Sequence, residues 1–529
     1  MKKLTLVLCL AAASAAIGQV RPAKTAEAPG VARKPKLILL VVLDQFRLDY
    51  FYRFGASYTG GLARLASQGA FFTNAHYEHF PTVTAVGHST MLSGALPAAS
   101  GIIANEWYER ETGKWITSVE DPATKLLGGG DAIGASPHRL MVSTIADELK
   151  MARPGSKAVG ISIKDRSAIL SVGRMADAAV WYDDKTGSFV SSTFYYPTLP
   201  EWVKGFNAGR PADRYLKGEW FSSEDPKIKL ATMPGKLNEH YWDELERSPW
   251  PNEMVEELTE RAVEAEKLGA DDVTDVLAVS FSANDTVGHR YGPDDPRVRD
   301  MALRADRLIG RLMAFLDKKV GMANVVTVMT ADHGVAPMPE VMKGRRMPGG
   351  RIVDEDIKDV VRKHLNAKYG TGGDWTPGKF ASILYLNRPL IASKRLDLKV
   401  VREEAAAIVR QIPHVFRVYT HDQITAGPGL GDRIDQRVRN GFFAPRAADL
   451  EIVLDPYWVF TDKGKVETSH GSTFNHDSHV PLILMGPGIK PGRYHGRVAI
   501  NDVAPTLATM LEVETPSGAM GRVLDEALR

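Results

Sequence analysis

Asp285 and His289 are the first residues whose types and spacing suggest shared chemistry. They are four positions apart, so both side chains face one side if the segment is helical. A carboxylate and an imidazole on one face can hold a single metal ion. Asp332-His333 and Asp44 each follow an apolar run and offer the same donors. Taken singly, each Asp could cap a helix and each His could be structural. Together they indicate a two-metal site, and thiol-free oxygen and nitrogen donors favour zinc over manganese.

The segment Pro81–Ser89 offers a hydroxyl group where a helix is expected to begin. Thr84 would lie near the helix N-terminus, where exposed N–H groups and the helix dipole favour an anion. The simpler interpretation is that Thr84 only caps the helix. Beside a metal, however, the same hydroxyl becomes a potential nucleophile, because the metal lowers its pKa and aligns it.

Lys164 and Arg166 form a third candidate group after another apolar run. Residues two apart on an extended chain project to one side, and Arg can grip two phosphoryl oxygens at once. A solvated surface pair is the alternative for these two residues taken alone. With the metal motifs and Thr84, the pair favours phosphoryl chemistry.

These residues need a scaffold, and short apolar runs alternating with helical stretches predict an α/β fold with a mainly parallel sheet. Predicted strands cover Leu37–Leu43, Lys157–Ile163, Val276–Phe281, Val325–Thr330 and Val480–Met485, and predicted helices cover Arg139–Met151, Pro251–Leu268, Val298–Lys318 and Val503–Leu511. Four of the strands end at or shortly before a charged or metal-competent residue. Ligands bind at the carboxyl ends of strands in open α/β sheets, so a site is expected there.

Two stretches fit this sheet poorly and are interpreted as cap insertions. Residues 196–250 are rich in aromatic side chains, which we expect to form the core of a capping subdomain rather than a substrate platform. Residues 337–470 carry mixed strands and helices, typical of a smaller α+β subdomain. The predicted organisation is a signal peptide at 1–18, a flexible lead-in at 19–35, catalytic core at 36–195, 251–336 and 471–529, and caps at 196–250 and 337–470.

Composition narrows the function classes and the compartment. The 529 residues include 66 basic and 64 acidic side chains, so no global field recruits nucleic acid. A single cysteine excludes disulfide frameworks and Cys-rich zinc modules. Lys2-Lys3 and the apolar run Leu4–Ile17 are typical of a signal peptide and too short for a transmembrane helix. Cleavage near residue 18 would leave a thiol-free, formally neutral chain in the periplasm or outside the cell.

The chain resembles the alkaline phosphatase superfamily, and within it the phosphate-irrepressible periplasmic enzymes with a Thr nucleophile. The resemblance rests on segments that span nearly the whole chain in family order: Leu43–Arg47, Pro81–His88, Gly94–Pro97, Ser100–Ile102, Asn105–Trp107, Ile163–Arg166, Asn284-Asp285, His289, Ala331–Gly334 and His479–Pro481. It implies an alkaline-phosphatase-like sheet covered by helices on both faces, with inserted capping subdomains.

The resemblance also implies roles for individual residues. One zinc ion would be held by Asp285, His289 and His479, and the second by Asp44, Thr84, Asp332 and His333. His470 and His476 compete with His479, but the family's ligand immediately precedes Val-Pro, which selects His479. Thr84 rather than Thr82 matches the nucleophile, the second Thr of the P-T-x-T pattern. The family's phosphoryl contacts fall on Asn105, Lys164 and Arg166.

The implied activity is zinc-dependent hydrolysis of phosphate monoesters with broad specificity, through a phosphothreonine at Thr84. Lys164 and Arg166 favour a monoester dianion over a diester, because the charges of two zinc ions are balanced by three Asp and the Thr84 alkoxide. The main alternative is a phosphodiesterase or nucleotide pyrophosphatase of the same superfamily. A non-catalytic zinc- or phosphate-binding protein is the distant alternative. Small phosphate monoesters are the expected partners, and the chain is expected to be a monomer.

Overall fold

The structure is a computed structural model, and it describes residues 34–379, 382–427 and 431–529. The predicted signal peptide (1–18) and nearly all of the predicted lead-in (19–35) lie outside the described residues. Among the helices that are described, none combines the length and the apolar character needed to cross a membrane.

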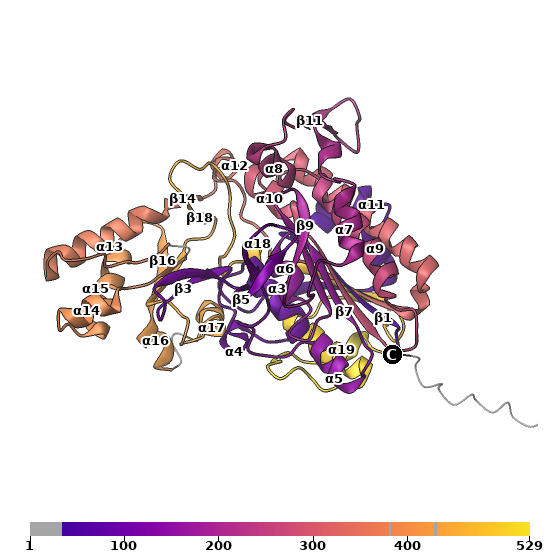
Figure 1. The fold of residues 1–529 in the computed structure, drawn as a ribbon. Helices are drawn as coiled ribbons and strands as arrows, with labels where there is room; N and C mark the ends of the chain where they lie inside the picture. Colours follow the sequence, from indigo (N-terminus) through magenta and orange to yellow (C-terminus); the bar gives the residue numbers. More distant parts are fainter. Residues whose placement is uncertain (1–33, 380–381, 428–430) are drawn as a thin grey trace, which may run out of the picture. The chain divides into compact units, whose positions relative to one another are not determined.

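The centre of the described chain is a parallel block within a twelve-stranded sheet (Figure 1). Its middle strand, β1 (Leu37–Leu43), pairs in parallel with β12 (Asp275–Phe281) and β13 (Val325–Thr330). Next to β12 run β7 (Ala158–Ser162) and β8 (Ala178–Asp183), also in parallel. Every side chain of β1 is fully buried, which explains its uninterrupted apolar sequence.

The sheet continues on both sides of this block, through antiparallel pairing of β19 (His479–Met485) on one side and of β9 (Ser188–Ser192) on the other. On one side β19 pairs with β13 and with β2 (Ala70–His76), which also carries the short strands β20 (Gly492–Tyr494) and β21 (Val498–Ala499). On the other side follow β9, β5 (Glu120–Leu127) and β6 (Ile133–Ala135). The predicted mainly parallel sheet is thus confirmed at its centre. Because β19 runs against β13, its first residue lies at the edge where the parallel strands end.

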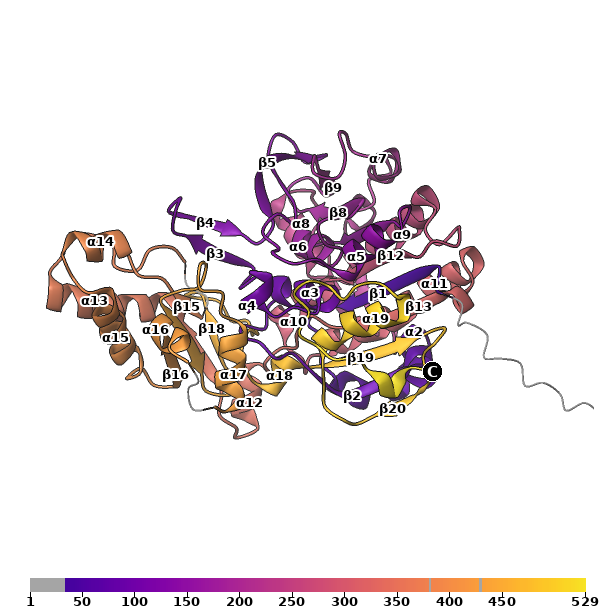
Figure 2. The same cartoon turned by 90° about the horizontal axis from the view of Figure 1, so that it is seen from below.

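Helices cover both faces of this sheet, as predicted (Figure 2). One group contains α2 (Gly61–Gln68), α9 (Trp250–Glu266), α10 (Ala283–Tyr291) and α11 (Pro296–Lys319), and the other contains α3 (Thr84–Ser93), α5 (Ile145–Ala152), α6 (Asp165–Leu170) and α19 (Val503–Leu511). Helix α5 starts six residues later than predicted. Thr144 caps it in a reciprocal pair with Asp147, and this capping box fixes the helix start.

The aromatic stretch at 196–250 does not form a core of its own. It contains α7 (Glu201–Ala208), β10 (Glu219–Phe221), β11 (Lys229–Thr232) and α8 (Glu239–Glu246). Phe206, Trp220 and Tyr241 are buried within the main core of the protein. The Trp220 indole N–H donates to Asp300 on α11 at 2.6 Å. The aromatics are therefore core residues, but they attach this segment to α9 and α11.

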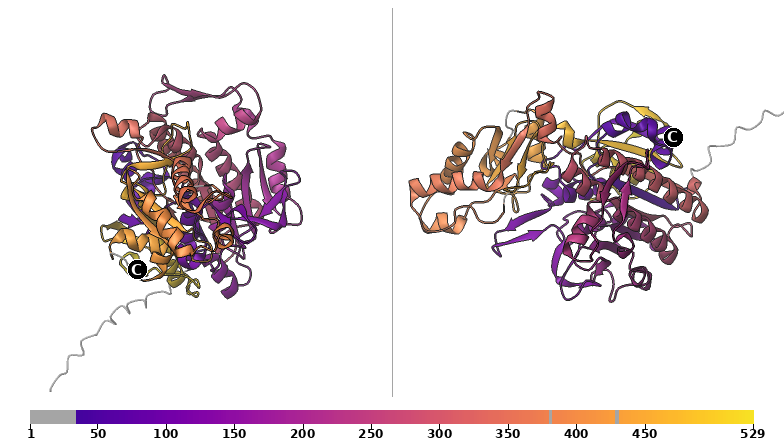
Figure 3. Two further views of the ribbon diagram at one scale, coloured as in Figure 1. Left: turned by 90° about the vertical axis from the view of Figure 1, so that its left-hand side faces the viewer. Right: turned by 90° about the horizontal axis from the view of Figure 1, so that it is seen from above.

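The stretch at 337–470 has its own α+β organisation and its own core. Its strands are β14 (Gly350–Val353), β15 (Ile383–Leu384), β16 (Val415–Thr420), β17 (Leu450–Leu454) and β18 (Trp458–Thr461), and its helices are α12 (Pro339–Gly344), α13 (Asp354–Tyr369), α14 (Arg388–Ser393), α15 (Leu398–Val409), α16 (His421–Thr425) and α17 (Arg433–Asn440). Trp375, Val401 and Ile452 belong to a hydrophobic cluster separate from the main core. Figures 1 and 3 show this group at one side of the central sheet, next to the hairpin of β3 (Glu106–Glu109) and β4 (Lys114–Thr117).

Candidate active site

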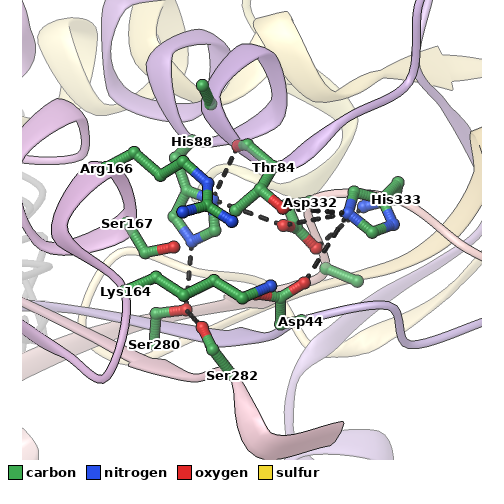
Figure 4. A network of polar contacts seen from close by, with 12 residues as sticks. Asp44, Thr84, His88, Lys164, Arg166, Ser167, Ser280, Ser282, Asp332 and His333 are labelled. Carbon is green, nitrogen blue, oxygen red and sulfur yellow. Dashed lines mark hydrogen bonds and ion pairs between the residues drawn. The ribbon is translucent and has the colours of Figure 1, made fainter. Parts of the chain in front are cut away.

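The chemistry-bearing residues converge at the carboxyl ends of the parallel strands (Figure 4). Asp44 follows β1, Lys164 follows β7, and Asp332-His333 follow β13. Asp285 lies in the first turn of α10, just after β12. Asp44, Asp332 and His333 are fully buried. The structure therefore brings together the residues that were selected because they follow the predicted strands.

Asp44, Asp332 and His333 form the first cluster, with ligand atoms within 4.8 Å of one another. The His333 Nε2 atom lies 3.6 Å from Asp44 Oδ1 and 3.4 Å from Asp332 Oδ2. Both of those carboxylate oxygens are buried and have no hydrogen-bond partner. Buried polar atoms are normally satisfied, so two buried carboxylate oxygens without partners beside one imidazole are suited to bind a cation. The residues present fit a metal ion at this position.

Thr84 approaches this cluster from α3. It is the first residue of the helix, after an extended Val83 that occupies the cap position without a side-chain bond. The Thr84 hydroxyl is therefore not used for capping, and its Oγ1 lies 3.4 Å from His333 Nε2. One turn later, Gly87 packs so tightly that an added Cβ would lie 2.3 Å from the Asp332 carbonyl oxygen. This close approach holds Thr84 against the metal-competent cluster.

Asp285, His289 and His470 form the second cluster. The Nε2 atoms of His289 and His470 lie 3.2 Å and 3.6 Å from Asp285 Oδ1. The Nδ1 of His289 is 2.8 Å from the Thr468 carbonyl, and that of His470 is 2.9 Å from the Thr82 carbonyl. Since carbonyls only accept, each Nδ1 carries the proton and each Nε2 is free to bind a metal.

The structure does not place His479, the predicted third ligand, in this cluster. His479 opens β19 in register with His76 of β2, and their rings stack with centroids 4.2 Å apart. Its Nε2 lies 3.2 Å from the Thr73 carbonyl, so strand pairing takes the side chain away from Asp285. His470 lies in the preceding loop and takes that place. Its sequence signal was the pair His470-Gly471, which repeats the pattern of His333-Gly334.

Lys164 lies between the two clusters. Its Nζ atom is 2.8 Å from Asp44 Oδ2 and 2.6 Å from Asp285 Oδ2. Burial opposes the lysine charge, but Asp285 and Asp44 raise the net pKa of Lys164 above its ordinary value. Burial, reinforced by Asp44, raises the pKa of Asp332 well above its ordinary value. Three buried carboxylates with one lysine leave excess negative charge, which divalent cations would offset.

Arg166, Asn105 and His88 complete the surroundings of Thr84. Arg166 lies at the start of α6, and its guanidinium points to the Thr84 side of the site (Figure 4). Asn105 Oδ1 accepts from the Ala85 N–H at 2.8 Å, which leaves its amide nitrogen available. His88 is bonded to the Thr84 carbonyl at 2.9 Å and to Ser280 at 3.0 Å, so it fixes α3 to β12.

A cavity of about 460 Å³ adjoins the second cluster. Near the metal-competent residues it is lined by Asn105, His289 and His470, with Glu246 and Arg247 on one wall. Residues of β17, of β18 and of the loop that follows β18 also line it. The cavity therefore connects the strand-end site to the α+β subdomain.

Comparison with known proteins identifies relatives over the full described fold. Residues 38–479 match the family model described as type I phosphodiesterase / nucleotide pyrophosphatase. Alkaline phosphatase PhoV of Synechococcus elongatus is 33% identical, covering 100% of both chains. Alkaline phosphatase PafA of Elizabethkingia meningoseptica is 33% identical over 94% of this chain and 95% of its own, and a protein named calcium-transporting ATPase of Myroides odoratus shows the same identity over the same shares. A PafA crystal structure superposes with a TM-score of 0.86 at 31% identity, covering 94% of this chain and 99% of that one.

The strand-end site, the matching α/β architecture and the full-length relatives agree with one another. The chain belongs to the type I phosphodiesterase / nucleotide pyrophosphatase family, and within the alkaline phosphatase superfamily it is a phosphatase of the PafA and PhoV type.

Proposed function

We propose that the protein is a zinc-dependent alkaline phosphatase that hydrolyses phosphate monoesters of broad structure through a phosphothreonine at Thr84. The observation that carries this proposal is the position of Thr84. Its hydroxyl is not used for helix capping and contacts His333 Nε2 at 3.4 Å, beside two buried carboxylate oxygens that lack hydrogen-bond partners. A hydroxyl so placed suits a nucleophile better than a structural cap.

The donor set fits two zinc ions. Asp44, Asp332 and His333, with Thr84 beside them, would hold one ion. Asp285 and His470 would hold the other together with His289, whose Nε2 lies 3.2 Å from Asp285 Oδ1. Carboxylate and imidazole donors without any thiol suit zinc, with manganese as the second choice. When bound, the two ions supply positive charge to the entering and leaving oxygens of an in-line displacement.

The residues of the chain then divide the reaction between them. Thr84 gives its hydroxyl proton to solvent and attacks phosphorus through Oγ1, and the bond from phosphorus to the ester oxygen breaks as the alkoxide leaves and takes a proton from solvent to become the alcohol. Water next attacks the phosphothreonine, and phosphate departs as Thr84 regains its hydroxyl. Lys164, Arg166 and the Asn105 amide would bind the non-bridging oxygens, over which negative charge is spread during transfer.

Monoester preference follows from charge. Two divalent ions are balanced by Asp44, Asp285, Asp332 and the Thr84 alkoxide, so Lys164 and Arg166 leave a net positive site for a dianion. A diester carries a single negative charge and matches this site less well. The proposed contacts all fall on the phosphoryl group, and the adjoining cavity of about 460 Å³ leaves room for varied leaving groups.

The test combines metal dependence with substrate choice. We expect an aryl phosphate to be hydrolysed much faster than its methyl diester, with activity lost on chelation and restored by zinc. Faster hydrolysis of the diester would identify the protein as a phosphodiesterase. Activity that survives complete metal removal would contradict the proposed zinc-dependent mechanism.

Thr84→Ala separates an enzyme from a binding protein. The enzyme should lose most turnover in this variant, whereas Thr84→Ser retains a hydroxyl and serves as the matched control. A binding protein would show no turnover in the wild type and would keep its phosphate affinity in Thr84→Ala.

We also propose that the protein acts as a monomer in the periplasm or outside the cell. The sequence of residues 1–18 supports the location. Cell fractionation of the full chain with N-terminal sequencing of the product tests it. An uncleaved cytoplasmic product would reject the proposed location.

A further inference from the structure

Gln45 lies between the two metal-competent clusters and contacts a carboxylate of each. Its backbone N–H donates to Asp332 Oδ1 at 3.0 Å, and its side-chain amide nitrogen donates to Asp285 Oδ1 at 2.5 Å. The side chain is 3% exposed, so water does not compete for these bonds. One residue thus joins the carboxylate at the end of β13 to the carboxylate at the start of α10.

The backbone of Gln45 adopts a conformation that only a constrained site maintains. Its φ is 62°, in the left-handed region that residues other than glycine rarely occupy. Such conformations persist where the surroundings fix them, and they gather at functional sites. Here the left-handed turn lets the N–H reach Asp332 while the side chain extends towards Asp285.

Gly288 accommodates the other end of the Gln45 amide. An added Cβ at position 288 would lie 1.8 Å from Gln45 Oε1, so any side chain there displaces the amide. The amide oxygen therefore rests against α10 while its nitrogen faces Asp285. This orientation is chemically required, because a carboxylate accepts hydrogen bonds and cannot donate to the amide oxygen.

The contacts of Asp285 show what this amide does. Lys164 occupies Asp285 Oδ2 at 2.6 Å, and Gln45 donates to Oδ1, the oxygen that faces His289 and His470. An oxygen of an ionised carboxylate has two lone pairs, so one remains directed towards the two imidazoles. Gln45 orients that lone pair without adding charge to a site already rich in carboxylates. A glutamate at position 45 would instead repel Asp285.

We propose that Gln45 is a positioning residue that aligns Asp285 through its side chain and Asp332 through its backbone, and so sets the geometry of both metal sites. This inference rests on the proposed two-metal function. Partners of this kind around a metal ligand commonly change metal affinity by about 10–100-fold when removed.

The experiment measures zinc affinity at each site by chelator competition on the zinc-loaded protein, together with kcat and KM. Gln45→Gly removes the amide, accepts the left-handed backbone and keeps the N–H to Asp332. We expect it to weaken one zinc ion by about 10-fold or more and to leave the other unchanged. Gln45→Glu keeps the size of the side chain and should weaken the same ion further.

Gly288→Ala provides an independent variant, because it displaces the amide while Gln45 and all proposed ligands stay in place. It should weaken the same zinc ion as Gln45→Gly, and the double variant should be no worse than Gly288→Ala alone. Unchanged affinities in Gln45→Gly, or additive losses in the double variant, would overturn the inference. Melting temperatures of the zinc-free variants control for misfolding. A wild type that binds no zinc would reject the proposed function itself, whereas two ions bound with wild-type affinity in Gln45→Gly would reject this inference alone.

Discussion

The imidazole rings of His333 and His470 stack with their centroids 3.5 Å apart and their planes 17° from parallel. His333 groups with Asp44 and Asp332, and its ring nitrogen also lies close to the ligand atoms of His470 and Asp285. The stack therefore joins the two proposed metal sites. Burial, with the neighbouring His333 and His289, lowers the pKa of His470 well below its ordinary value. The ring is thus neutral, which is the form that ligates a metal.

The position of His470 predicts a clear contrast between two histidine variants. His470→Ala should remove one zinc ion and lower kcat/KM by at least about 100-fold, because a proposed ligand is lost. His479→Ala should keep both zinc ions and most activity, since His479 contacts Thr73 and His76 instead. Zinc content by mass spectrometry and turnover of an aryl phosphate check both. The reverse result would restore His479 as the ligand.

The sequence predicts the strand-end residues well, because local pattern determines them. β1 and β13 have the predicted bounds, and the strand-end argument brought Asp44 and Asp332 to one place. The structure does not place His479 among the proposed metal ligands, and the local sequence pattern does not contain the reason. Whether its side chain faces Asp285 or His76 depends on the antiparallel register of β19 against β2, a pairing between distant parts of the chain.

In the cap regions, too, local sequence pattern does not reveal contacts between distant parts of the chain. The aromatic content of residues 196–250 indicates buried side chains. It does not show whether they belong to a separate core of this segment or, as the structure has it, to the main core of the protein. Trp220 bonds to Asp300 on α11, a partner that lies 80 positions away along the chain. The start of α5 could have been read locally, since Thr144 and Asp147 have capping-box spacing. Gln45 lies in the segment Leu43–Arg47 that carries the resemblance, but the sequence did not indicate its role, because that role depends on φ and on contacts with distant residues.

Arg166→Ala should reduce monoester hydrolysis more than diester hydrolysis. Apart from contacts with its neighbour Asp165, the guanidinium has no partner among the described residues, so it is available to a phosphoryl group. A hydrogen bond to a charged group contributes roughly 1.5–3 kcal/mol, which corresponds to about 10–150-fold in kcat/KM. The ratio of monoester to diester kcat/KM is the measurement. Lys204 forms an exposed ion pair with Glu201, and Lys204→Ala serves as the surface control. An unchanged ratio would mean that Arg166 does not contact the substrate.

Glu451→Gln should change how stability depends on pH. Burial alone raises the pKa of Glu451 to about 8, from an ordinary value of 4.5. The folded chain thus binds this proton more tightly than the unfolded chain, so the stabilisation is complete below pH 4.5 and is lost as pH rises to 8. Glutamine keeps the uncharged form throughout. The variant should be more stable at pH 9, by ~5 kcal/mol at most.

Denaturant unfolding of the wild type and the variant between pH 5 and 9 measures this difference. Other titrating groups cancel in the comparison, because both chains carry them. Glu111→Gln, at an exposed position in the hairpin of β3 and β4, provides the surface control. Parallel curves for the wild type and Glu451→Gln would show that this carboxyl is solvated in solution.

Gly87→Ala tests whether the spacing between α3 and β13 sets the reaction geometry. The added methyl group would lie 2.3 Å from the Asp332 carbonyl oxygen and 2.8 Å from its Cα, both of them backbone atoms. β13 is paired on both sides in the sheet, so α3 must move, and Thr84 moves with it away from His333. A displacement of about 1 Å can cost roughly 100-fold in rate. Overpacking should also destabilise the fold by about 1–3 kcal/mol.

The matched control for that variant is Gly205→Ala in α7, where an added Cβ meets no atom within 4 Å. An alanine inside a helix is favoured over glycine by up to ~1 kcal/mol, so this variant should be equally active and slightly more stable. Single-turnover kinetics, zinc affinity and melting temperature compare the two substitutions. Since both are glycine to alanine changes in helices, a loss confined to Gly87→Ala isolates the contact with Asp332. Full activity in Gly87→Ala would show that α3 can shift without disturbing the nucleophile, and the proposed role of this packing would then be wrong.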